Sequence, residues 1–108
     1  MQNPVQGRED GFKPTGIKPV VMKEIQALAK TYGLRKVVLF GSRARGDFCP
    51  KSDIDLAVSC GEIDRFRLAV NEETNTLLGF DVVNLDRSVQ SELLEAIRRE
   101  GRVLYEEV

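Results

Sequence analysis

The chain has 108 residues, a length that suits one domain with a single core. Sixteen Lys and Arg nearly balance seventeen Asp and Glu, which argues against a nonspecific nucleic-acid-binding protein, because such proteins carry a strongly basic surface. No apolar run approaches the roughly 18 residues that cross a membrane, so the composition predicts a soluble globular domain without a membrane partner.

The beginning of the chain differs in composition from the rest. Residues 1–19 are rich in Pro, Gly and charged side chains and contain no apolar segment of a signal peptide, so we expect a flexible arm there and a single domain over 20–108. Cys49 and Cys60 fit no metal-ligand spacing, and the chain contains no His. Both are therefore predicted to be free thiols in a reducing cytoplasm.

Apolar residues follow the 3.6-residue period of a helix in some segments, whereas short β-branched or aromatic runs elsewhere predict strands. In chain order we expect a helix over 20–32, a strand over 36–40, a short helix after Gly41, a loop over 47–52, a strand over 53–59, a helix over 62–78, a strand over 80–85, a helix from a Ser88 cap to Gly101 and an edge strand over 102–105. This alternation predicts an α/β (α+β) fold in which helices cover a sheet.

Two acidic residues lie two positions apart at the start of the strand predicted over 53–59. Because alternate residues of a strand share a face, Asp53 and Asp55 are expected to project together, with Ile54 on the buried side. Two adjacent carboxylates repel each other, and a hard divalent cation such as Mg²⁺ relieves that repulsion. The alternative is that Asp53 begins the strand as a turn residue and that Asp55 lies on a solvated face beside Lys51.

A glycine and a serine follow the strand predicted over 36–40. Gly41 and Ser42 can offer backbone N–H groups to an anion such as a phosphate, and Gly41 has no Cβ to obstruct its approach. The alternative is an ordinary turn in which Ser42 caps the helix. Arg43 and Arg45 follow within the next turn, and Arg43 is the preferred residue for neutralising phosphate charge.

These features together are more specific than any one of them. Phe40-Gly41-Ser42, followed after ten residues by Asp53-Ile54-Asp55-Leu56, resembles the motif of the DNA polymerase β nucleotidyltransferase superfamily. The longer string GSRARGDFCPKSDIDLAV is similar to that of the minimal nucleotidyltransferase (MNT) family. The resemblance covers about residues 20–108 and implies a polymerase β-like nucleotidyltransferase fold, in which helices flank a small mixed sheet.

The superfamily carries a third acidic residue on a later strand, and Asp81 matches it by position. Glu62 and Asp64 compete for this role, but both belong to the start of a helix, where acidic residues are favoured by the helix dipole. Asp86 lies beyond the strand and is expected to cap a helix. A turn-capping Asp81 after Gly79 is the alternative.

By resemblance, the catalytic and metal-binding residues are Asp53, Asp55 and Asp81, and the nucleotide-binding residues are Gly41, Ser42 and Arg43. Two Mg²⁺ ions and ATP as the substrate are expected. The resemblance also implies that Asp81 accepts the proton of an attacking hydroxyl group. The roles of Arg45 and Lys51 stay open.

MNT proteins include MntA-type antitoxins, which pair with helical HEPN toxins. The resemblance implies an adenylyltransferase that moves AMP from ATP to a tyrosine of such a partner, and the short chain implies that the partner supplies part of the site. Two alternatives stay open: a noncatalytic antitoxin or nucleotide-binding subunit that acts by contact, and transfer to a small molecule such as an aminoglycoside. The predicted edge strand also leaves open pairing with a second copy of the chain.

Overall fold

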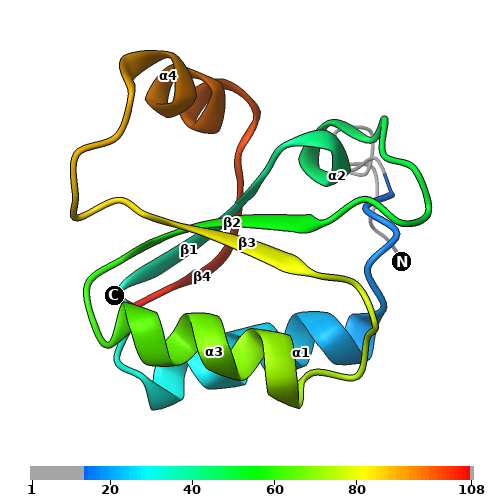
Figure 1. Ribbon diagram of the computed structural model, residues 1–108, viewed down its shortest axis with the longest axis horizontal. Helices are drawn as coiled ribbons and strands as arrows, with labels where there is room; N and C mark the ends of the chain where they lie inside the picture. The colour runs from blue at the N-terminus through cyan, green and yellow to red at the C-terminus, as the bar shows by residue number, and fades with distance from the viewer. Residues whose placement is uncertain (1–13, 108) are drawn as a thin grey trace, which may run out of the picture.

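The computed structural model describes residues 14–107, in which helices and strands alternate (Figure 1). In chain order the elements are α1 (Pro19–Thr31), β1 (Lys36–Phe40), α2 (Ser42–Arg45), β2 (Ile54–Ser59), α3 (Ile63–Glu73), β3 (Phe80–Asn84), α4 (Ser91–Glu100) and β4 (Arg102–Glu106). The arm predicted over 1–19 falls mostly outside the described residues. Within the part that is described, no helix has the length and apolar character needed to cross a membrane.

The strands form one mixed sheet in the order β3-β2-β1-β4. β1 pairs antiparallel with β2 and β4, whereas β2 and β3 are parallel and are joined by a crossover through α3. Because β1 runs against β2 and β3, the end of β1 and the starts of β2 and β3 lie at the same edge of the sheet. The predicted α/β fold with a small mixed sheet flanked by helices is thus confirmed.

Helices cover both faces of the sheet, with α1 and α3 on one face and α2 and α4 on the other (Figure 1). The larger core lies beneath α1 and α3, where Ile25 and Phe66 pack with strand residues such as Leu56 and are fully buried. A smaller cluster beneath α4 consists of Val38, Phe40, Ala57 and Ile97. Each large buried side chain contributes about 1.5–3 kcal/mol to folding, so most of the stabilisation comes from the α1–α3 face.

Two predicted helices differ in length from the observed ones. α3 ends at Glu73 rather than near Leu78, because Thr74 adopts extended backbone and its hydroxyl group donates a hydrogen bond to the Val70 carbonyl (2.7 Å). α4 begins at Ser91 rather than directly after Ser88, because Gln90 keeps a non-helical ψ of 141° and its carbonyl accepts a backbone hydrogen bond from Leu94. Cys49 and Cys60 are exposed free thiols, as predicted.

Candidate active site

The turn after β1 brings the backbone against an acidic side chain. Gly41 has a φ of 79°, which favours glycine, and a Cβ atom there would lie 2.2 Å from Oδ2 of Asp55. Phe40 is the register partner of Asp55 in the β1–β2 ladder, which explains this proximity. The absence of a side chain at Gly41 is therefore a steric requirement of the Asp55 carboxylate.

Three acidic residues gather at this edge of the sheet. Asp55 on β2 is half-buried, and the parallel pairing places Asp81 of β3 directly beside it in register. Asp53 is exposed and immediately precedes β2. Ile54 and Leu56 are fully buried in the larger core, so the strand separates the carboxylates from the apolar side chains as alternation predicts.

The negative charges of Asp81 and Asp53 both act on the carboxyl group of Asp55. Burial first, and then the negative charges of Asp81 and Asp53, together raise the pKa of Asp55 from 3.8 to about 6, while the positive charge of Arg45 opposes the shift. Burial and like charges both disfavour the ionised form of a carboxyl group. The cluster of Asp53, Asp55 and Asp81, called the acidic cluster below, therefore carries repulsion that a cation would relieve.

The donor chemistry of the acidic cluster fits a hard divalent cation, because Mg²⁺ and Ca²⁺ prefer carboxylate oxygen ligands. As the side chains stand, no group of three His, Cys, Asp or Glu residues between positions 14 and 107 is arranged to hold a metal ion. Mutual repulsion keeps uncompensated carboxylates apart. Joint coordination of one ion by the cluster would thus need side-chain rotation.

Arg43 does not lie where the prediction for a phosphate-binding residue requires it. Its side chain is buried, with 1% of its surface exposed, and its guanidinium group lies 4.6 Å from the centre of the Phe48 ring. It donates hydrogen bonds to the carbonyl oxygens of Ser52 (3.0 Å), Thr15 (2.8 Å) and Pro50 (3.1 Å). These contacts tie together the chain before α1, α2 and the loop before β2, so the buried guanidinium group of Arg43 holds these segments in place and is not free to contact a phosphate.

Arg45 is the arginine that acts on the acidic cluster. It is exposed, and its positive charge lowers the pKa of Asp55. Its guanidinium group forms ion pairs with Asp47 (3.2 Å) and with Glu100 at the end of α4 (2.9 Å), and hydrogen bonds to Asp47 and then Glu100 raise its own pKa. Arg45, and not the Arg43 predicted to neutralise phosphate charge, is therefore the arginine of α2 whose charge acts on Asp55.

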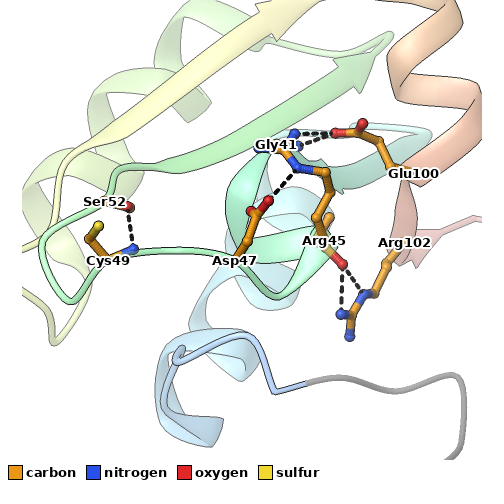
Figure 2. Close-up of polar contacts among 8 residues, drawn as sticks. Gly41, Arg45, Asp47, Cys49, Ser52, Glu100 and Arg102 are labelled. Carbon is orange, nitrogen blue, oxygen red and sulfur yellow. Dashed lines mark hydrogen bonds and ion pairs between the residues drawn. The ribbon is translucent and has the colours of Figure 1, made fainter.

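Glu100 is a residue of this site that the sequence did not reveal. The Gly41 N–H donates a hydrogen bond to Oε1 of Glu100 (3.1 Å), the same oxygen that accepts a bond from Arg45 (Figure 2). The Gly41 N–H group, predicted to be free for an anion, is thus already bound to a carboxylate. No spacing in the sequence signals this contact, because 59 positions separate the two residues.

The competing acidic residues have other partners. Asp64 pairs with Arg67 on α3, and Glu62 with Arg65. Asp86 accepts a hydrogen bond from the backbone N–H of Cys60. Unlike Asp81, none of these three acidic residues lies in register with Asp55 or contributes to its raised pKa.

An open groove adjoins the acidic cluster. It has a volume of about 870 Å³ and lies between the start of α1, the loop before β2 and the segment after α3. Asp53, Lys51 and Lys18 line it together with Leu77, whose side chain is fully exposed. Lys51 therefore lines the same groove as Asp53 of the acidic cluster.

The family model described as "Polymerase beta, Nucleotidyltransferase" matches residues 23–108. The chain is also 37% identical over 93 residues to the protein named "Putative protein adenylyltransferase MJ0604" of Methanocaldococcus jannaschii. That alignment covers 75% of this chain and 90% of the archaeal protein. The matched region contains the turn at Gly41 and all of the acidic cluster.

Solved structures share the fold. A toxin–antitoxin crystal structure with AMP-PNP has a TM-score of 0.60 and 24% identity, and a mutant of the toxin–antitoxin MntA-HpeT has a TM-score of 0.63 and 22% identity. Each match covers 80% of this chain and 73% of the other. Because the family model spans most of its length and the archaeal relative is 37% identical, the chain belongs to the polymerase beta nucleotidyltransferase family and is a transferase enzyme.

Proposed function

We propose that this nucleotidyltransferase transfers AMP from ATP to a hydroxyl group of a partner protein in the cytoplasm. The observation that carries the proposal is the pairing of Asp55 with Asp81 on parallel strands, against the backbone turn at Gly41. Nucleotidyl transfer depends on positioning and on neutralising the charge of the phosphates. Carboxylates that can hold cations beside a close backbone turn meet both needs.

The acidic cluster would hold two Mg²⁺ ions, which neutralise triphosphate charge and favour ionisation of the attacking hydroxyl group. Gly41 and Ser42 would contact the β- and γ-phosphates through their backbone N–H groups. Arg45, and not Arg43, would neutralise phosphate charge, because the exposed guanidinium group of Arg45 lies beside Asp55.

Asp81 would accept the proton of the attacking hydroxyl group. The acceptor oxygen forms a bond to the α-phosphorus of ATP while the bond from that phosphorus to the β-phosphate oxygen breaks, and pyrophosphate leaves. The proton of the hydroxyl group passes to the Asp81 carboxylate. The product is an acceptor that carries AMP through a new phosphoester bond.

A tyrosine of a HEPN-type toxin is the acceptor we propose, which makes the chain an antitoxin. The archaeal relative is named as a protein adenylyltransferase, and both solved structures cited above are toxin–antitoxin structures. The groove beside Asp53, at about 870 Å³, offers room for a polypeptide segment next to the acidic cluster. Its open walls suit an acceptor that belongs to a second protein.

The position of the transferred phosphate tests the reaction type. The chain is incubated with Mg²⁺, the product of its neighbouring gene and ATP labelled either at the α-phosphate or at the γ-phosphate. We expect protein-bound label from α-labelled ATP alone, and no labelling when EDTA is present during the incubation. Transfer of the γ-label would show phosphoryl transfer instead, and neutralisation of the partner without any label would favour the noncatalytic antitoxin.

A further inference from the structure

The last residue of α4 places a carboxylate on the proposed phosphate-binding groups. Glu100 has 14% of its side chain exposed, and its Oε1 atom accepts hydrogen bonds from the Gly41 N–H and from Arg45 (Figure 2). A phosphate oxygen would accept hydrogen bonds from the same kinds of donor, a backbone N–H and a guanidinium group. The contact therefore presents a carboxylate oxygen in the chemical setting of a phosphate oxygen.

We propose that Glu100 is an internal anion that competes with the triphosphate for Gly41 and Arg45, and that it sets the affinity for nucleotide; this inference rests on the function proposed above. The two donors cannot serve Glu100 and a phosphate fully at the same time, because the two anions would also repel each other. Binding of nucleotide therefore includes the displacement of Glu100.

The displacement is confined to the Glu100 side chain, because the backbone that follows is tightly packed. A Cβ atom on Gly101 would lie 2.4 Å from the carbonyl oxygen of Ile97 and 2.5 Å from a methyl group of Val38. The backbone at the end of α4 is thus packed closely against Ile97 of the same helix and against β1. Asp47 stays paired with Arg45 when Glu100 leaves, which keeps the guanidinium group beside the site.

The Glu100→Gln variant tests the competition. Gln keeps the size and an acceptor oxygen but loses the charge that makes the hydrogen bonds strong. With AMP-PNP and Mg²⁺ as the probe, calorimetric titration should give a Kd about three- to tenfold lower than that of the wild type, which corresponds to the loss of part of one charge-assisted bond. Glu95→Gln, the same change at an exposed position of the same helix, should leave Kd unchanged.

A second variant covers the case in which Glu100→Gln does not fold. Glu100→Asp retains the charge on a shorter side chain that cannot reach both donors from the fixed helix end, so it should also tighten binding. A Kd equal to or higher than that of the wild type in a folded variant overturns the inference and leaves Glu100 as a structural residue. Absence of AMP-PNP binding by the wild type as well as the variants would overturn the proposed nucleotide site together with this inference.

Discussion

Asp55 holds its proton to a higher pH in the folded protein than an ordinary aspartic acid does, because burial and the charges of Asp81 and Asp53 raise its pKa to about 6. A raised pKa means that the folded state binds the proton more tightly than the unfolded state. The stabilisation from Asp55 is therefore complete below about pH 4 and is lost as the pH rises through about 6. This window applies to the protein without a divalent cation.

The Asp55→Asn variant tests that linkage. In EDTA at pH 7.5 we expect the variant to unfold with a free energy about 1 kcal/mol higher than the wild type, a value discounted because Asp55 is only half-buried. Near pH 4 the two proteins should be equally stable. Urea denaturation at both pH values measures the difference, and a difference that does not change with pH would contradict the assigned cause.

Substitutions of the two arginines should have different effects, one on the free energy of unfolding and the other on nucleotide binding. Arg43→Met leaves four carbonyl oxygens without their charged donor, so we expect a loss of about 2–4 kcal/mol in the free energy of unfolding. Arg45→Gln should leave the urea midpoint unchanged and weaken AMP-PNP binding about tenfold. If Arg43→Met folds normally and is the variant that loses nucleotide, the assignment of the two arginines is reversed.

The sequence alone could not show which of the two arginines of α2 is free to contact a phosphate. Arg43 and Arg45 stand two positions apart on a single helical turn, and their spacing from Gly41 fits both. What separates them is the packing of Thr15 and of the loop before β2 around Arg43, a long-range effect with no local pattern. Strand alternation and the family motif both predict Asp53 and Asp55 as site residues, whereas Asp81 is predicted only by its match to the third acidic position of the family.

The turn between β1 and α2 should tolerate no side chain at Gly41. Gly41→Ala adds a strained φ and a contact of 2.2 Å with Asp55, so we expect a loss of about 2–4 kcal/mol and a defect in AMP-PNP binding. Gly33→Ala is the matched control, because Gly33 has a similar φ of 70° and nothing within 4 Å of the added Cβ. It should cost about 1–2 kcal/mol and leave binding unchanged.

Urea denaturation and calorimetric titration of the two glycine variants separate backbone strain from the steric demand of the acidic cluster. Equal losses of stability with intact binding in both would mean that Gly41 matters only for its backbone angles. The closeness of Gly41 to Asp55 would then have no role in the site.

Most elements were predictable because their residues repeat with the period of a helix or strand. The end of α3 was not, because the extended backbone of Thr74 ends the helix and Asn75 after it is held by hydrogen bonds to Glu24 of α1, a contact between distant segments. The strand order was likewise beyond the sequence. It arises because α3 crosses over to place β3 beside β2, and this crossover is what brings Asp81 next to Asp55.

In the whole molecule, the two faces of the sheet have different tasks. The α1–α3 face holds the larger core, whereas the α2–α4 face combines a small apolar cluster with the turn at Gly41, Arg45 and Glu100 (Figures 1 and 2). The acidic cluster lies at the end of the sheet where β1 finishes and β2 and β3 begin, and Asp55 projects from the same face as Ala57 of the smaller apolar cluster. Substitutions in the acidic cluster should therefore abolish AMP transfer without unfolding the protein.

Intact-mass spectrometry of the neighbouring gene's product, co-expressed with this chain, measures whether the acidic cluster is needed for AMP transfer. With the wild-type chain and with the control Glu95→Gln, we expect the mass of the partner to be raised by whole AMP units. With Asp53→Asn, Asp55→Asn or Asp81→Asn, each confirmed to fold by circular dichroism, we expect an unmodified partner. AMP units that persist unchanged in the aspartate variants would contradict a catalytic role of the acidic cluster. AMP units that are absent with a folded wild-type chain and partner would contradict AMP transfer itself.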